Sequence, residues 1–429
     1  MRQVDDIGLA GVEGMLVEMW EKVLKLSDVG IEDNFFELGG NSIAAAKFTN
    51  LLQERLGEPV QVTLLYEMPT IGSLAEYLVE SYSDALSGIS GQYVNASNRK
   101  KLVRLTDKDV GYVRETLSAL NRHWADEHRD GGKVNQGSKN PQAIFVLCTA
   151  RSGSTLLRVM LGGHPELFSP PELLLLPFNS LQARDEVFSG ARSIWSEGVI
   201  RAIMEIKRCE VEPAKEILAR CENEDLTVKA FYARLQEWLG SRRLVDKSPS
   251  YAQDVRILER AEAYFHDALY IHLLRHPVAM INSYERQRID QLSFKENLGY
   301  DSRQMAELLW IVSHQNIIEF LGKVPRERQC RVAFEDMVKQ PRKVMENVCA
   351  FLKLDFDEEM LTPHQNQERK MTDGTQSTSR MLGDPKFHSY KTIDASVADG
   401  WQKERPATLS EITWGLAEEL GYERPSELS

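Results

Sequence analysis

The chain has 429 residues, a net charge of −12 at neutral pH and 27% charged side chains, which is typical of a globular protein with two or three domains. Its apolar runs are too short to cross a bilayer, so no membrane partner is expected. Residues 1–90 carry 15 acidic and 5 basic side chains, which argues against a nucleic-acid partner. The five cysteines form no CxxC pair and no metal-ligand spacing, so we expect reduced thiols, a cytoplasmic location and no metal site.

Residues 7–82 are expected to form a small all-α bundle with four helical elements. Apolar residues spaced three and four apart between Leu9 and Val23 indicate the first helix. A loop over residues 28–40 follows it. The other helical elements are expected at Ser42–Leu56, near Thr63–Ile71 and at Ser73–Ser81.

The loop and the second helix contain the stretch FFELGGNSI, in which Ser42 stands at the helix start. This stretch resembles the signature of the acyl and peptidyl carrier domains of modular synthases. The resemblance implies a carrier domain over residues 1–84, with 4′-phosphopantetheine on Ser42 and a phosphopantetheinyl transferase as a partner. A phosphate at a helix start would lie at the positive end of the helix dipole. The alternative is that Ser42 only caps the helix.

Residues 85–142 are expected to be a linker that contains one helix. Ser, Gly, Asn and Asp are frequent at its two ends, as is typical of connecting segments. Thr106 and Asp109 have the spacing of a capping box, and apolar residues then recur at helical spacing up to Trp124. The helix over about 107–127 is expected to dock on the following domain, because Trp124 would otherwise be exposed.

From residue 143 to residue 429, strand and helix patterns alternate, which predicts an α/β domain with a central parallel sheet flanked by helices. Four apolar strands are expected at Ala143–Thr149, Arg243–Asp246, Ala268–Leu274 and Cys330–Phe334. The helices are expected at Ala191–Ile206, Thr227–Leu239, Ala252–Ala263, Pro277–Asp290, Arg303–Phe320 and Arg342–Leu354.

The stretch AIFVLCTARSGSTLLR, residues 143–158, joins the first of these strands to a helix through a polar turn. Backbone N–H groups and the helix dipole at such a turn converge on one point and favour a phosphate group. The residues expected to bind it are Arg151, Ser152, Gly153, Ser154 and Thr155. The turn lacks the GxxxxGK[ST] pattern of ATP and GTP loops. The alternative is a helix N-terminus without a ligand.

A second candidate element is LLRHPVAMINSYERQR, in which Arg275 ends a strand and Ser283 follows on the next helix. These two side chains can hold one anion from two sides. Together with the 150–155 turn, the pair resembles the elements with which sulfotransferases bind 3′-phosphoadenosine 5′-phosphosulfate (PAPS). The resemblance implies a P-loop-like sulfotransferase domain over residues 143–429. It places the turn on the 5′-phosphosulfate, and Arg275 and Ser283 on the 3′-phosphate.

Three shorter motifs agree with this resemblance. The first, Asp246-Lys247-Ser248-Pro249, resembles the DK[ST]P segment of these enzymes. The second, Phe334-Glu335-Asp336-Met337, resembles their (Y/F)ED(L/M) element, which we interpret as structural. The third is GDPKF at 383–387, in which Lys386 and Phe387, together with Trp401, resemble the late loop that closes over the nucleotide.

The acceptor alcohol of a sulfotransferase needs a base, and Glu172 is the first candidate. The stretch RSGSTLLRVMLGGHPELFSPPEL is similar to the corresponding part of tyrosylprotein sulfotransferases, whose base aligns with Glu172. His276 and His164 are weaker candidates, because a His before Pro more often packs in a turn. Leu174 stands where that group has a substrate-facing Arg, so the LLLLPF run suggests either an apolar acceptor or ordinary core packing.

A carrier followed by a sulfotransferase resembles the terminal modules of olefin-forming, curacin-type polyketide synthases. There the sulfotransferase sulfates a β-hydroxyl of the carrier-bound acyl chain, and a thioesterase then releases a terminal alkene. The resemblance implies upstream synthase modules as partners. This chain has no GxSxG elbow, so we expect either that it is a fragment or that a separate thioesterase acts with it. By analogy with phosphoryl transfer, Arg151 and Lys247 are expected to stabilise charge on the leaving phosphate. The alternatives are a different hydroxylated acceptor, a nucleotide phosphotransferase, and a docking module without activity.

Overall fold

The computed structural model describes residues 8–40, 42–58, 60–83, 85–86, 104–126, 138–189, 193, 195–224, 226–287, 298–373, 375, 387, 390–403 and 409–424. The chain divides into two compact units, one made of Met1–Arg104 with Ser283–Arg303 and the other of Leu105–Asn282 with Gln304–Ser429. The predicted bounds 1–84, 85–142 and 143–429 stay predictions. Within the described segments, none of the helices is long and apolar enough to cross a membrane.

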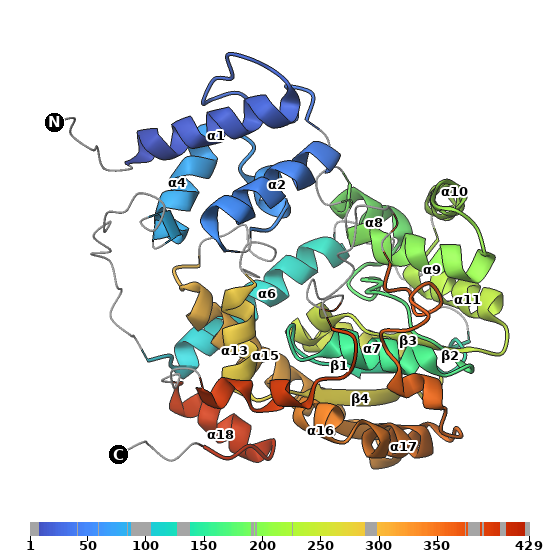
Figure 1. Cartoon of the computed structure of the whole chain (residues 1–429). Coiled ribbons are helices and arrows are strands. Elements are labelled where there is room, and N and C mark those ends of the chain that lie inside the picture. The colour runs from blue at the N-terminus through green and yellow to red at the C-terminus, as the bar shows by residue number, and fades with distance from the viewer. Residues whose placement is uncertain are drawn as a thin grey trace. The chain divides into compact units, whose positions relative to one another are not determined.

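The first unit contains the helical bundle that the apolar spacing predicts. Its helices are α1 (Leu9–Leu24), α2 (Ser42–Leu56), α3 (Thr63–Glu67) and α4 (Ile71–Ser81), and α1 packs against both α2 and α4 (Figure 1). The Trp20 ring is fully buried and meets the edge of Phe35 at 4.8 Å. A Cβ on Gly40 would lie 2.4 Å from Phe35, so the second glycine of the motif lets the loop close on this core just before Ser42.

The second unit is built on a sheet of five parallel strands. In chain order these are β1 (Ile144–Leu147), β2 (Leu167–Phe168), β3 (Arg243–Asp246), β4 (Leu269–Leu274) and β5 (Gln329–Ala333). They lie in the order β2-β3-β1-β4-β5. Because parallel strands end at the same edge, the segments that follow β1, β3 and β4 come together there.

Alternate residues of the strands face opposite layers of helices, so both faces of the sheet are buried. Phe145 and Tyr270 point to a layer that contains α8 (Leu181–Val187), α9 (Glu197–Lys207), α10 (Val211–Asn223), α11 (Val228–Leu239), α12 (Val255–Tyr264) and α15 (Ser302–Leu321). Ile144 and Ile271 belong to the core on the other side of the sheet. This face is covered by α7 (Ser154–Gly163), α16 (Phe334–Lys339) and α17 (Pro341–Leu352), which Figure 1 labels.

The helix expected near 107–127 is α6 (Asp107–Asp126), and Thr106 and Asp109, the pair expected to form a capping box, bond to each other at its first turn. The Thr106 backbone N–H and hydroxyl both donate to the Asp109 carboxylate, at 2.7 and 2.6 Å. Arg256, on α12, donates to the Ser118 carbonyl at 2.7 Å, so α6 is held against α12 within the second unit. The side chain of Trp124 lies outside the described residues.

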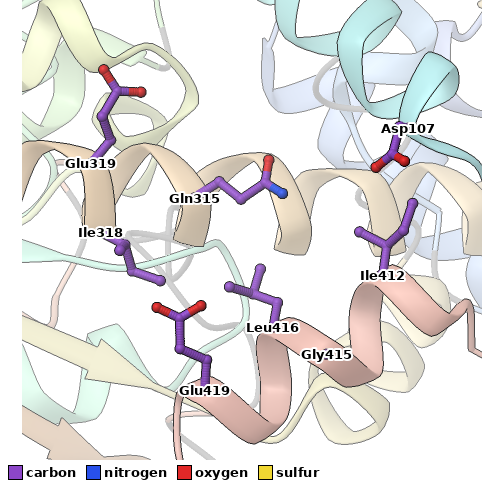
Figure 2. A pocket seen from close by; sticks show the side chains of 8 residues that line it. All are labelled: Asp107, Gln315, Ile318, Glu319, Ile412, Gly415, Leu416 and Glu419. Carbon is purple, nitrogen blue, oxygen red and sulfur yellow. The ribbon is translucent and has the colours of Figure 1, made fainter.

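The remaining elements connect or cover the layers. They are α13 (Pro277–Arg286), α18 (Glu411–Glu419), η3 (Pro249–Gln253), η4 (Arg326–Arg328), η5 (Glu358–Leu361), η7 (Ala395–Ala398) and η8 (Gly400–Lys403). A hollow of about 500 Å³ lies among α6, α15 and α18, and Figure 2 shows the side chains that line it. No residue of the 150–155 turn lines this hollow.

Candidate active site

The turn after β1 leads into the N-terminus of α7, as the sequence predicts. Arg151 and Gly153 both have left-handed backbone angles, with φ of 62° and 81°. A Cβ on Gly153 would lie 2.2 Å from the ring of Phe334, so the turn needs glycine here for both conformation and space. Among the described residues, no side chain caps α7, so its first N–H groups remain available to an anion.

The hydroxyl groups of the turn divide into two kinds. Ser152 is fully buried, and its Oγ lies 2.6 Å from the Thr149 Oγ1, so this hydroxyl holds the turn together. Ser154 is also buried at the start of α7, whereas Thr155 is partly exposed. The role of Ser152 as a direct ligand stays a prediction, and the structure gives it a bond within the turn.

The side chain of Arg275, at the end of β4, reaches the turn. Its Nη1 donates to the carbonyl oxygen of Arg151 at 2.7 Å. Its guanidinium carbon lies 4.4 Å from the centre of the Phe334 ring, which supports a cation–π contact. The two phosphate-binding elements that the sequence proposes therefore meet at Arg275. Ser283 belongs to the other compact unit, and its pairing with Arg275 stays a prediction.

A buried ion pair lies at the same edge of the sheet. The Lys247 Nζ, just after β3, is 2.7 Å from the Glu172 Oε1. The Lys247 side chain is 2% exposed and the Glu172 side chain 29% exposed, so the carboxylate is the partner that faces solvent. Because β3 pairs with β1, Lys247 emerges beside the end of β1, where the turn begins. The structure thus brings together two of the predicted catalytic residues.

The segment after Glu172 is held by a buried carboxylate, that of Asp246, which the sequence analysis named within the DK[ST]P-like motif without assigning it a role. The Asp246 carboxylate accepts hydrogen bonds from the hydroxyls of Tyr251 and Ser248, both at 3.1 Å, and burial raises its pKa to about 6. The same two hydroxyls accept the backbone N–H groups of Leu175 and Leu174, at 2.8 and 3.3 Å. This arrangement fixes the chain that carries Glu172, including the left-handed Leu174 (φ 50°).

The LLLLPF run packs in the core. Leu173, Leu175, Leu176 and Phe178 are all fully buried in the layer formed by α8–α12. Arg184 is also fully buried there and donates to the carbonyl groups of Leu173 and Leu174. The structure therefore favours the core-packing interpretation of this run over an acceptor-binding one.

Comparison with known proteins agrees with this geometry. Residues 141–358 match the profile described as "Sulfotransferase family", which covers half of the chain. The chain belongs to the sulfotransferase family. Residues 16–78 match the profile described as "Phosphopantetheine attachment site". The protein thus combines a carrier domain with a sulfotransferase domain, as the two resemblances implied.

Two solved structures are similar to the sulfotransferase unit. The sulfotransferase domain from the curacin biosynthetic pathway is 41% identical, with a TM-score of 0.62 over 67% of this chain and 100% of that one. The sulfotransferase domain from the Synechococcus PCC 7002 olefin synthase is 39% identical, with a TM-score of 0.61 over 68% and 98%. Gramicidin S synthase 2 from Aneurinibacillus migulanus is 36% identical over 104 residues, 23% of this chain. The chain spans about 2% of the length of that synthase.

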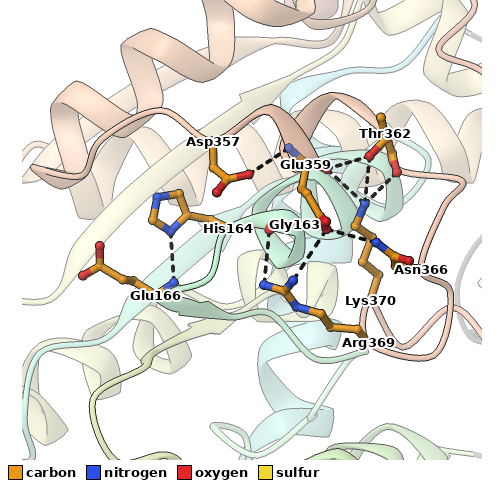
Figure 3. Close-up of polar contacts among 9 residues, drawn as sticks. All are labelled: Gly163, His164, Glu166, Asp357, Glu359, Thr362, Asn366, Arg369 and Lys370. Carbon is orange, nitrogen blue, oxygen red and sulfur yellow. Dashed lines mark hydrogen bonds and ion pairs between the residues drawn. The ribbon is translucent and has the colours of Figure 1, made fainter.

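The two histidines proposed as weaker bases lie in different surroundings. His276 is buried, its ring stacks on Trp401 at 3.7 Å, and burial lowers its pKa to about 4. His164 follows the C-terminus of α7, about 15 Å of helix away from Ser154. Its Nδ1 accepts the N–H of Glu166 (Figure 3). Its Nε2 lies 2.8 Å from the Asp355 carbonyl oxygen. We therefore assign His164 a structural role.

The segment that leads to the predicted late loop is anchored by buried cations. The Lys370 ammonium donates to the carbonyl oxygens of Glu359 and Thr362, at 3.0 and 2.6 Å (Figure 3). Arg158, on α7, donates to the carbonyl oxygens of Lys370 and Met371. Lys386 and residues 383–385 of the late loop lie outside the described residues, whereas Phe387 is buried with its ring 4.6 Å from His364.

Sequence reasoning missed Arg158 and Lys370 and assigned no role to Asp246, because a buried charge leaves no periodic pattern. Arg158 is the last residue of the stretch AIFVLCTARSGSTLLR. Its position among apolar residues of α7 that are buried could have indicated that its side chain is buried too. Among the residues that the structure describes, no group of three His, Cys, Asp or Glu side chains could hold a metal ion.

Proposed function

We propose that the protein transfers a sulfuryl group from PAPS to a β-hydroxyl of an acyl chain. The chain would be carried as a thioester on 4′-phosphopantetheine at Ser42. The observation that carries this proposal is the Lys247–Glu172 ion pair at the strand edge that also holds the 150–155 turn. A buried cation beside a partly exposed carboxylate suits a reaction in which one oxygen gains negative charge and another loses a proton.

The residues at this edge fit a nucleotide with two separate anionic groups. The uncapped N-terminus of α7 and the ammonium of Lys247 would bind the 5′-phosphosulfate. Arg275, bonded to the turn at Arg151, would bind the 3′-phosphate, together with Ser283. PAPS, when bound, supplies an activated sulfuryl group whose leaving group is a phosphate. Lys386 and Phe387 are proposed to close over the nucleotide.

The chain's own groups then perform two tasks. Lys247, Arg151 and the N–H groups of α7 hold the phosphate and stabilise the charge that develops on its bridging oxygen. Glu172 accepts the proton of the acceptor hydroxyl at a carboxylate oxygen, and the bonds from Tyr251 and Ser248 to the following backbone hold it in place. His276 stays the second candidate base, although its ring is buried against Trp401.

The likeness to the curacin and olefin synthase domains supports a place in the formation of a terminal alkene. In this scheme a phosphopantetheinyl transferase loads Ser42, and upstream synthase modules deliver the hydroxyacyl chain. A thioesterase then releases the sulfated product by decarboxylation and loss of sulfate. All of these steps are proposed to take place in the cytoplasm.

The test is intact-mass analysis of the pantetheinylated chain loaded with 3-hydroxyacyl groups. With PAPS, we expect the acyl-carrier to gain the mass of one sulfuryl group. The Ser42→Ala variant cannot be loaded and serves as the control. Loss of the gain when the hydroxyl is moved to another carbon would confirm the β position. A phosphoryl gain with ATP, or no gain with PAPS on any hydroxyacyl chain, would contradict the proposal.

A further inference from the structure

Two consecutive residues of one strand end contact two consecutive residues of its neighbour. β4 and β5 are parallel partners, and Leu274 pairs with Ala333, so the residues that follow each of them emerge side by side. The Phe334 ring lies against the Arg275 guanidinium at 4.4 Å. The Glu335 Oε1 accepts the backbone N–H of His276 at 2.9 Å.

The Phe334 ring also fills the space beneath the phosphate-binding turn. It is 6% exposed, and a Cβ on Gly153 would lie 2.2 Å from its Cδ2. One ring therefore touches both the turn and Arg275, and Arg275 itself donates to the Arg151 carbonyl at 2.7 Å. Stacking uses the face of a guanidinium and leaves its in-plane N–H groups to make hydrogen bonds.

Glu335 is itself held from a distant part of the chain. Its Oε2 accepts the hydroxyl of Tyr422 at 3.0 Å, and the Tyr422 ring packs edge-on against His276 at 5.3 Å. The Trp401 ring stacks on the His276 ring at 3.7 Å. Glu335 thus ties the backbone next to Arg275 to the segment that follows α18.

We propose that Phe334 and Glu335 are positioning residues of the nucleotide site. Phe334 holds the Arg275 guanidinium flat against the turn, with its edge turned to the 3′-phosphate, and Glu335 fixes the backbone from which Arg275 projects. An arginine that is ordered before binding loses less side-chain freedom when the anion arrives. This inference rests on the proposed function, because it takes Arg275 as the contact to the 3′-phosphate.

The experiment measures calorimetric binding of two probes to the full chain, 3′-phosphoadenosine 5′-phosphate and adenosine 5′-phosphate. The second probe lacks the 3′-phosphate, so the ratio of the two affinities reports Arg275. Phe334→Leu should lower this ratio about three- to tenfold, as expected for loss of a cation–π contact. Phe334→Tyr keeps the ring and should leave the ratio within about twofold of the wild type. Phe356→Leu, which removes a ring 5.0 Å from Arg342, is the matched control and should leave the ratio unchanged.

Glu335 is tested in the same assay. Glu335→Ala removes the acceptor of the His276 N–H and should lower the ratio about threefold, whereas Glu335→Gln keeps an acceptor and should lower it less. Thermal unfolding of each variant shows whether the domain is still folded. A general loss of structure lowers both affinities together and leaves their ratio unchanged.

Arg275→Ala separates this inference from the function on which it rests. If the wild type prefers the 3′-phosphorylated probe and Arg275→Ala removes the preference, Phe334→Leu should have no further effect in that background. An unchanged ratio in Phe334→Leu, or an equal loss for both probes, would overturn the inference while leaving the function intact. A wild type without any preference would instead overturn the assignment of Arg275.

Discussion

The carrier unit and the sulfotransferase unit place the groups that we propose to react by different means. Ser42 stands at the start of one helix, and the loop before it closes locally through Gly40 and Phe35. The sulfotransferase site is assembled from separate segments, and the residues of its ion pair are 75 positions apart. Modification of Ser42 should therefore be insensitive to substitutions elsewhere in the chain. Activity and nucleotide binding at the assembled site should instead fall by different amounts, depending on which of its residues is substituted.

The largest expected effect tests the local half of this comparison. Ser42→Ala should abolish pantetheinylation, and with it all transfer to the carrier, because no other hydroxyl stands at this helix start. Mass spectrometry after treatment with a phosphopantetheinyl transferase measures this. Ser27→Ala, an exposed serine of the same unit, is the matched control and should still be modified. Modification of the Ser42→Ala chain would contradict the assignment of Ser42 as the attachment site of 4′-phosphopantetheine.

The next largest effect tests the sulfotransferase site, which is assembled from separate segments. Glu172→Gln keeps the size of the side chain but cannot accept a proton, so turnover should fall about 10²–10⁴-fold. Nucleotide affinity should be unchanged. Sulfated acyl-carrier is followed by mass against time, with the exposed Glu166→Gln as control. If Glu172→Gln costs little turnover and His276→Ala or His164→Ala costs more, Glu172 is not the base.

A smaller effect is expected at the second phosphate element. Arg275→Ala removes one charge-assisted contact, so binding of 3′-phosphoadenosine 5′-phosphate should weaken by about 1.5–3 kcal/mol. The preference over adenosine 5′-phosphate should disappear. Calorimetry with both ligands measures this, and Arg326→Ala, an exposed arginine, should change neither affinity. Equal weakening of both ligands would make Arg275 a purely structural residue.

The smallest expected effect is a difference between the two units in how their stability depends on pH. Residues 1–84 contain no histidine, whereas β4 and α15 bury His272 and His314 with Nε2 and Nδ1 3.0 Å apart. Burial lowers the pKa of His314 to about 3 and that of His272 well below its usual value. The unfolded chain therefore binds more protons as the pH falls below 6.5. Lowering the pH from 8 to 6 should cost the folded sulfotransferase unit about 1 kcal/mol for each of these histidines.

Hydrogen exchange of β4 and α15 peptides at pH 8 and pH 6, compared with α1 and α4 peptides, measures this difference. His314→Gln keeps a hydrogen-bond partner for His272 and removes one titrating ring, so it should reduce the pH dependence of β4 and α15. An equal pH dependence of the carrier helices would contradict the expectation.

The sequence by itself determined the order of the elements and the places where chemistry is concentrated. Apolar spacing predicted α1 and α2 to within about two residues, because burial of one helix face leaves a period in the sequence. The bounds of α15 and of the strand Arg243–Asp246 were also predicted, but these two elements are buried on more than one face and were recognised from the alternation of strand and helix segments. The helix expected at Ala191–Ile206 begins only at Glu197, and β2, two residues long, is too short to leave any period. The elements at 150–155 and 275 were found because each comes at the end of a strand, and the segment at 246–249 was found by its resemblance to the DK[ST]P segment of sulfotransferases.

Only the tertiary structure decided which groups meet. It paired Lys247 with Glu172, brought Arg275 to the Arg151 carbonyl, buried the LLLLPF run and put His164 at the far end of α7. Arg158 reaches a carbonyl 212 residues away. Such contacts depend on how the layers pack around the parallel sheet. A single buried polar residue leaves no repeating pattern in the sequence, so its hydrogen-bond partner cannot be predicted from periodicity. For that reason the sequence could name the candidate residues, and the fold alone could say how they are held.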